Sequence, residues 1–145
     1  EMFEAVGSDY WHTFFSRVRE LLVSKGKAVI QTIMIEDEYF EDYRKSPDFI
    51  QTYIFPGGEL ASPRIITQIA RANGLEIINN MSFPLSYAKT LEAWYQRFQS
   101  AWPEIMSMGF DQEFKQAWDM YLAYCRGGFL NGRLIVSQYT LQSND

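Results

Sequence analysis

The chain has 145 residues, of which 47% are hydrophobic and 21% charged, proportions typical of a globular protein that buries a core. Its net charge of −5, with 13 scattered basic residues, argues against nucleic acid as a partner, because no basic run is present to neutralise phosphates. No apolar stretch reaches the roughly 18 residues needed to span a bilayer, and the single cysteine, Cys125, excludes an internal disulfide and suits a reducing compartment.

The N-terminal part of the chain predicts a helix followed by a strand. Ser8 or Asp9 can cap the helix, and Gly26 ends it as a C′ glycine. Its inner face, spaced as on one side of a helix, consists of Phe14, Phe15, Val18, Leu21 and Leu22. Residues 27–35 are β-branched and nearly all apolar, which is typical of a buried strand in a parallel sheet. Residues 36–51 mix acidic and aromatic side chains with a proline, so we expect a lid-like insertion with short helical pieces.

The middle of the chain predicts a second helix and a second strand. Ser62 followed by Pro63 is a strong helix start, because serine caps a helix and proline fits its first position. Asn73 and Gly74 are a typical helix end. The inner face of this helix consists of Ile65, Ile66, Ile69 and Ala70. Residues 75–83 then predict the second strand.

The C-terminal part predicts two aromatic-rich helices and a last strand. The first of these helices is expected to stop at Pro103, and its apolar stripe is Leu91, Trp94, Tyr95, Phe98 and Trp102. Asp111 caps the next helix, which we expect to end at the glycine pair 127–128. Its inward side chains are Phe114, Trp118, Tyr121, Leu122 and Cys125. Residues 133–141 predict the last strand.

The order of these elements is helix, strand, lid, helix, strand, two helices and strand. Alternation of this kind predicts a layered α/β fold of three strands with flanking helices. No internal repeat or low-complexity tract is present in the sequence.

Three separate motifs add a family resemblance to this pattern. Residues 1–7 read Glu-Met-Phe-Glu-Ala-Val-Gly, residues 53–62 read Tyr-Ile-Phe-Pro-Gly-Gly-Glu-Leu-Ala-Ser, and residues 87–91 read Tyr-Ala-Lys-Thr-Leu. In this order they resemble the C-terminal half of the cyclopropane-fatty-acyl-phospholipid synthase family, which includes the mycolic acid cyclopropane synthases. The resemblance runs from residue 1 to about residue 141.

The resemblance implies a class I, Rossmann-like methyltransferase fold that uses S-adenosylmethionine. In that fold the final strand runs antiparallel between the two strands before it. No Gly-x-Gly-x-Gly occurs in the chain, so residues 1–145 are interpreted as the C-terminal part of one methyltransferase domain without its N-terminal cofactor-binding half. We therefore expect no cofactor-binding residues in this chain, and we expect the chain alone to be inactive.

Two candidate site residues lie near the predicted first strand. From the residues alone, Glu4 is a carboxylate favoured by a helix N-terminus, and Gln31 satisfies a neighbouring backbone group. The resemblance instead implies that Glu4 helps to hold a bicarbonate ion, which the side chain at position 31 and the backbone of Ile33 also contact. The best-known members have histidine where this chain has Gln31, and glutamine cannot change its charge near neutral pH.

Two further candidates lie on the C-terminal helices. Tyr87 is a packing residue by its position, whereas the resemblance implies that its hydroxyl binds the same bicarbonate. Cys125 is a small apolar residue on the inner face of its helix, whereas the family suggests a catalytic cysteine there. His12, the only histidine, has no partner at ligand spacing, so we expect no metal site.

The function implied by the resemblance is transfer of a one-carbon unit from S-adenosylmethionine to the double bond of an unsaturated phospholipid acyl chain. We expect such an enzyme to be cytoplasmic, to contact the inner face of the membrane peripherally, and to form a homodimer through an open sheet edge. Two alternatives remain: a methyltransferase that acts on another lipid or on a small molecule, and a non-catalytic interaction module.

Overall fold

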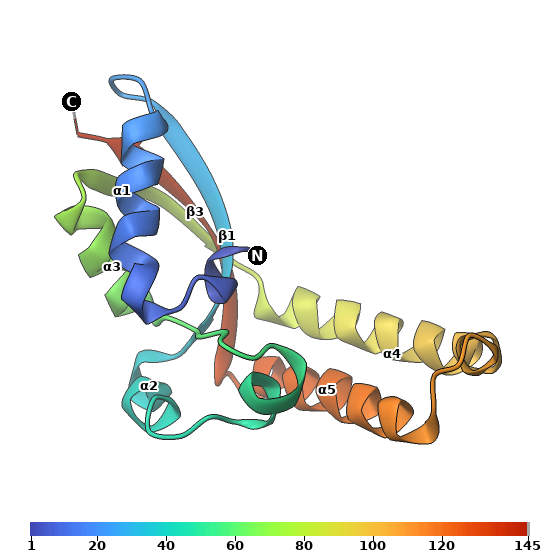
Figure 1. Cartoon of the computed structure of the whole chain (residues 1–145). Helices are drawn as coiled ribbons and strands as arrows, with labels where there is room; N and C mark the ends of the chain where they lie inside the picture. The colour runs from blue at the N-terminus through green and yellow to red at the C-terminus, as the bar shows by residue number, and fades with distance from the viewer. Residues whose placement is uncertain (145) are drawn as a thin grey trace.

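The computed structural model describes residues 1–144, and its centre is a three-stranded sheet (Figure 1). The strands are β1 (Lys27–Ile35), β2 (Leu75–Ser82) and β3 (Leu134–Ser143), and their order in the sheet is β1-β3-β2. Both outer strands pair antiparallel to β3. The expected strands and the central position of the last strand are therefore confirmed.

Helices cover one face of this sheet along its length and the opposite face only near one end. The helices α1 (Trp11–Leu21) and α3 (Pro63–Ala72) pack on the face that carries Met34 and Leu141, both fully buried (Figure 1). Val29 lies on the opposite face and is largely exposed. The expectation of a strand buried on both faces is wrong for the first half of β1, because no described element packs over that part of the sheet.

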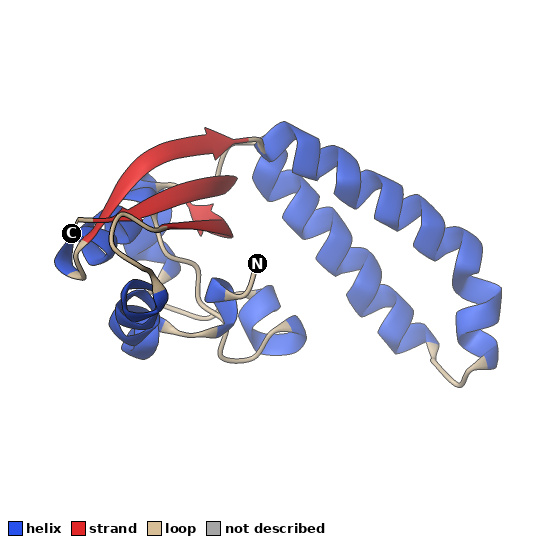
Figure 2. Ribbon diagram, turned by 90° about the horizontal axis from the view of Figure 1, so that it is seen from above, coloured by secondary structure: helices blue, strands red, loops and turns tan. Residues whose placement is uncertain are grey.

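A long helical hairpin extends from one end of the sheet (Figures 1 and 2). It consists of α4 (Pro84–Ser107) and α5 (Gln112–Leu130), which share a second hydrophobic cluster with the start of β3. The prediction that Pro103 stops the first of these helices is wrong. Phe98 and Trp102 belong to the cluster shared with α5, and this packing maintains the helix past the proline.

The expected end of α5 at its glycine pair is also wrong, because the helix continues to Leu130. A methyl group on Gly128 would lie 2.7 Å from Cδ1 of Leu134, whereas one on Gly127 would have no neighbour within 4 Å. Gly128 thus allows the helix to approach β3 closely, and it does not terminate the helix.

The predicted helix starts are confirmed for α3 and α5. The Ser62 side chain accepts a hydrogen bond from the Ile65 N–H at 3.4 Å, and Pro63 occupies the first helical position. Oδ1 of Asp111 accepts from the Phe114 N–H at 2.9 Å. These caps satisfy backbone donors that have no partner within the helix.

The predicted start and end of α1 are wrong. Residues Ser8–Tyr10 form a separate 3-10 turn, η2, and α1 begins at Trp11 without a side-chain cap. The helix ends at Leu21, which is exposed, so Gly26 lies in the following turn and not at the helix end. By contrast, Asn73 does end α3, as expected.

The segment between β1 and α3 contains the expected short helical pieces. These are α2 (Asp37–Tyr43) and the single π-turn η3 (Ile50–Ile54). A further 3-10 turn, η1 (Phe3–Ala5), lies near the N-terminus. That this insertion acts as a lid stays a prediction.

The two outer strands have different edges. The Ile35 N–H at the end of β1 donates to the carbonyl oxygen of Ala61 at 3.0 Å, so part of this edge is covered. Within the described residues β2 pairs only with β3. An open edge can pair with a second chain, and the expected homodimer stays a prediction.

Among residues 1–144 no helix combines the length and apolarity needed to cross a membrane.

The glycine pair of α5 provides a matched test of the hairpin packing. We expect Gly128→Ala to lower the free energy of unfolding by about 1–3 kcal/mol, because Leu134 must move to admit the methyl group. Gly127→Ala should raise it by roughly 0.5–1 kcal/mol, because alanine is the better helix former. Urea unfolding of both variants measures the difference. Equal stabilities would contradict the close packing of α5 on β3.

Candidate functional site

The N-terminal segment lies along the outer edge of β1 (Figure 1). The Glu1 nitrogen donates to the Gln31 carbonyl oxygen at 2.8 Å, and the Ile33 N–H donates to Oε1 of Glu4. Alternate residues of an antiparallel strand direct their backbone groups to the same edge. Two outward-facing residues of β1 thus receive partners from the first motif, which brings two carboxylates to this edge.

The carboxylate of Glu4 is fixed on one side and free on the other. Phe3 beside it is buried, and its ring lies 5.7 Å from that of Trp11, which holds the η1 turn against the core. Oε1 of Glu4 also accepts from Oγ1 of Thr32 at 3.2 Å. Oε2 is buried without a hydrogen-bond partner. The motif glutamate is therefore anchored on β1, and it retains an unused acceptor.

Glu1 links strand β1 to helix α4. Its Oε1 accepts a hydrogen bond from Nε2 of Gln31, and its Oε2 accepts from the Tyr87 hydroxyl at 2.6 Å. Oε1 of Gln31 accepts in turn from Nε2 of Gln138 on β3 at 2.9 Å. The glutamine amide is thus held from both ends, with its donor directed to Glu1.

The structure brings four of the five predicted site residues together around β1. They are Glu4, Gln31, Ile33 and Tyr87. Burial is the main cause that raises the pKa of the Tyr87 hydroxyl, and the hydrogen bond to Glu1 and its charge add to it. Tyr87 consequently remains protonated over the ordinary pH range and acts as a donor.

Cys125, the fifth predicted residue, lies apart from these contacts. It is partly buried in the cluster between α4 and α5, and no described contact joins it to Glu4 or Gln31. Burial, with a smaller effect of the Asp48 charge, raises the pKa of the Cys125 thiol to about 12. A thiol that stays protonated is a poor nucleophile and a poor base. The raised pKa therefore favours the interpretation of Cys125 as a small apolar packing residue.

The Phe-Pro-Gly-Gly motif shapes the chain around Glu4. Gly57 has a φ of +83°, which favours glycine, and a methyl group on Gly58 would lie 3.1 Å from the Phe55 carbonyl oxygen. This turn directs the Glu59 N–H to the Glu4 carbonyl oxygen at 2.9 Å. The second motif therefore supports the first.

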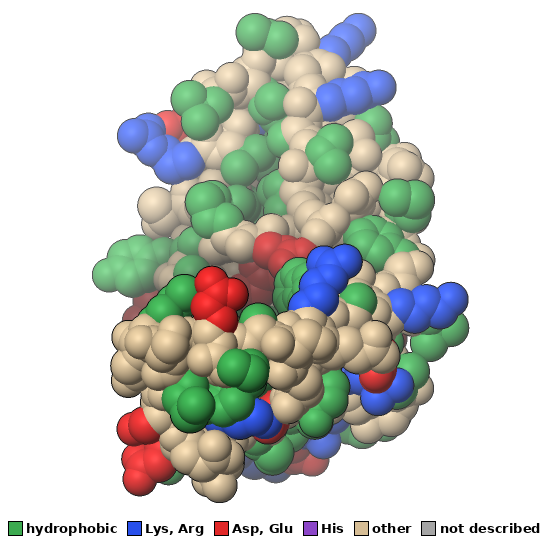
Figure 3. Space-filling view, turned by 90° about the vertical axis from the view of Figure 1, so that its right-hand side faces the viewer, with side chains coloured by type: hydrophobic (Ala, Val, Ile, Leu, Met, Phe, Trp, Pro, Cys, Tyr) green, Lys and Arg blue, Asp and Glu red, His purple; other side chains and the backbone are tan. Residues whose placement is uncertain are grey.

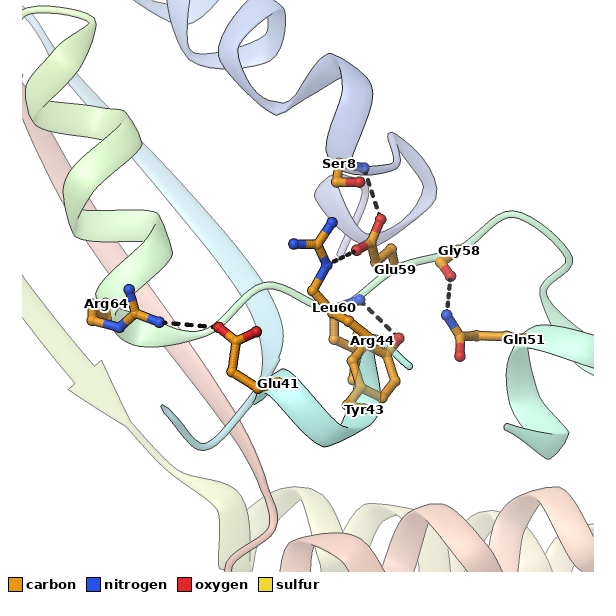
Figure 4. Close-up of polar contacts among 9 residues, drawn as sticks. All are labelled: Ser8, Glu41, Tyr43, Arg44, Gln51, Gly58, Glu59, Leu60 and Arg64. Atoms are coloured by element: carbon orange, nitrogen blue, oxygen red, sulfur yellow. Dashed lines mark hydrogen bonds and ion pairs between the residues drawn. The ribbon is translucent and has the colours of Figure 1, made fainter. Parts of the chain in front are cut away.

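The Glu59 side chain extends this support to the insertion (Figure 4). Its carboxylate accepts from the Ser8 N–H at 3.0 Å and from Nε of Arg44 at 3.1 Å. Nearby, the Leu60 N–H donates to the Tyr43 hydroxyl at 3.0 Å. Sequence reasoning did not single out Glu1 or Glu59, because neither lies in a periodic pattern and their partners are distant in sequence.

The residues at β1 do not fit bicarbonate as they are arranged. An anion needs donors, and the three donors expected to hold it are engaged: Gln31 and Tyr87 by Glu1, and the Ile33 N–H by Glu4. The unpartnered buried atom at this site is Oε2 of Glu4, an acceptor that repels an anion.

The site faces the same side as the helical hairpin. Figure 3 shows acidic side chains in a recess above the hairpin on this side of the molecule. A groove of about 880 Å³ lies elsewhere, between α3 and the start of β2, and is lined by Arg71 and Glu76 among others. It shares no residue with the cluster around β1.

The order of the strands and the helices packed on them are those of a class I methyltransferase fold. The crystal structure of mycolic acid cyclopropane synthase CmaA1, complexed with SAH and CTAB, matches it with a TM-score of 0.89 and 30% identity. That match covers 98% of this chain and 53% of the solved one. The family model described as mycolic acid cyclopropane synthetase matches residues 1–139, so this chain belongs to that family.

Two curated relatives show how much of a family member this chain represents. Tuberculostearic acid methyltransferase UfaA1 of Mycobacterium tuberculosis is 38% identical over 142 residues, 97% of this chain and 33% of the relative. Cyclopropane-fatty-acyl-phospholipid synthase of Escherichia coli is 37% identical over 129 residues, 88% of this chain and 32% of the relative. The chain thus spans about a third of the length of these two relatives.

Proposed function

We propose that the complete gene product containing this chain transfers a one-carbon unit from S-adenosylmethionine to the double bond of an unsaturated phospholipid acyl chain. The sulfonium donor supplies an electrophilic methyl group. Attack by the alkene leaves a carbocation, from which a proton must be removed. The observation that supports the proposal is the convergence of Glu1, Glu4 and Tyr87 at the end of β1, because carboxylates stabilise nearby positive charge and accept protons.

The identity of the cofactor and substrate is supported by the family. CmaA1, similar over nearly all of this chain, is complexed with SAH, and the Escherichia coli relative is named a cyclopropane-fatty-acyl-phospholipid synthase. Among the described residues no glycine-rich turn that could hold the donor is present. In the proposed enzyme, this chain helps to position the acceptor and to remove the proton.

A second candidate product is a methyl or methylene branch instead of a ring. Gln31 stands where the best-known cyclopropane-forming members have histidine, and the relative from Mycobacterium tuberculosis is named a tuberculostearic acid methyltransferase. The neutral amide cannot itself accept a proton. This observation favours a different fate for the carbocation, on the same scaffold and with the same donor.

Labelling the lipid products distinguishes these candidates. We expect the complete protein, incubated with methyl-labelled S-adenosylmethionine and vesicles of unsaturated phospholipid, to transfer the label into acyl chains. Mass spectrometry of the released fatty acids separates rings from branches. Saturated phospholipid is the matched control, because it offers no double bond. Label that stays in water-soluble products would contradict the lipid acceptor.

We also propose that the turn between α4 and α5 contacts the lipid surface. Three apolar side chains are exposed at the end of this hairpin: Met106 at 57%, Met108 at 65% and Phe110 at 44%. The hairpin end occupies the lower half of Figure 3, where hydrophobic side chains lie open to solvent. Apolar side chains grouped at the tip of a projecting element are suited to enter the headgroup region of a membrane.

Vesicle binding tests the role of this turn. We expect the double substitution Met108→Ser and Phe110→Ser to lower partitioning onto phosphatidylcholine vesicles at least about threefold, because less apolar surface leaves water. Val23→Ser is the control, since Val23 is also an exposed apolar residue, at 77%, but lies in the turn between α1 and β1. Equal binding of both variants in a flotation assay would assign the lipid contact to another surface.

A further inference from the structure

The Glu1 carboxylate accepts hydrogen bonds from the same side chains that, by the family resemblance, would donate to bicarbonate. Gln31 donates to one of its oxygens and Tyr87 to the other. These two contacts come from different elements, β1 and α4, and they hold both oxygens of one carboxylate. A bidentate arrangement of this kind is what a bound carboxylate-like anion would adopt, and here the anion is part of the chain.

We propose that Glu1 is the proton acceptor of the reaction and replaces bicarbonate in this enzyme. The inference rests on the proposed function, because it assigns the base for that same carbocation. Each oxygen of an ionised carboxylate has two lone pairs, so the hydrogen bonds from Gln31 and Tyr87 leave acceptor capacity on both oxygens. Glu1 is exposed in the described chain.

The step balances without a further reactant. The π pair of the alkene forms a bond to the methyl carbon while the sulfur–carbon bond breaks and its electrons remain on sulfur. The neighbouring alkene carbon is left positive. Glu1 then takes one proton from the added methyl group, and the released C–H pair forms a new carbon–carbon bond to the cationic carbon. The resulting carboxylic acid returns its proton to water before the next turnover.

The residue at position 31 is consistent with this assignment. An uncharged donor is sufficient to orient a carboxylate supplied by the chain, and Gln31 is such a donor, with its own orientation fixed by Gln138. Tyr87 is a second donor that stays protonated. A bicarbonate ion added beside Glu1 and Glu4 would bring three carboxylate-type groups together, and like charges at contact distance repel one another strongly.

Two measurements on the complete protein test the assignment, with Glu1→Ala as the variant. Glu76→Ala is the matched control, because Glu76 is an exposed glutamate on β2 that is not part of the cluster. We expect wild-type turnover to be unchanged in buffer freed of carbon dioxide. Glu1→Ala should lower turnover at least about a hundredfold, which is typical for a lost general base, and added bicarbonate or formate should restore part of it. Glu76→Ala should keep wild-type turnover.

Binding of ¹³C-labelled bicarbonate, followed by NMR line broadening, gives a readout that does not depend on activity. We expect no binding to the wild type and binding to Glu1→Ala, whose vacated donors accept the ion. Bicarbonate binding by the wild type, or wild-type turnover in Glu1→Ala, would overturn the inference. A wild type that transfers no label to lipid refutes the proposed function separately, and the bicarbonate measurement then still decides whether Glu1 occupies the anion position.

Discussion

The outer edge of strand β1 is the constraint on which the site depends. In the described chain β1 has a neighbouring strand only on its β3 side. Backbone groups at positions 31, 33 and 35 point away from that neighbour and need partners, since an unpaired buried N–H or C=O destabilises the fold. The partners are the nitrogen of Glu1, the carboxylate of Glu4 and the carbonyl of Ala61.

Covering this edge also fixes the candidate site residues in place. A side-chain carboxylate that accepts from a strand N–H is fixed as rigidly as the strand, and Glu4 is in turn supported by the turn at Gly57 and by Glu59. Rigid support of this kind keeps functional groups in place before the reaction begins. The motifs at residues 1–7 and 53–62 are thus two halves of one structural unit.

The fold could be predicted where local patterns decide it. The three strands and the caps at Ser62 and Asp111 follow from periodicity and side-chain hydrogen bonding, which are local. Pro103 and Gly128 were misjudged because packing between α4, α5 and β3 outweighs their usual effect on helices. The site was predictable in part through the resemblance, whereas Glu1 was not, because its partners are 30 and 86 residues away.

Amide hydrogen exchange at Ile33 tests most directly whether Glu4 secures the edge of β1. A hydrogen bond to a charged group contributes about 1.5–3 kcal/mol, so we expect Glu4→Ala to accelerate exchange at Ile33 at least about tenfold. Ile35 should keep its protection, because its partner is the Ala61 carbonyl oxygen. Unchanged exchange at Ile33 in the variant would show that Glu4 does not hold this edge, and the site would need another organising contact.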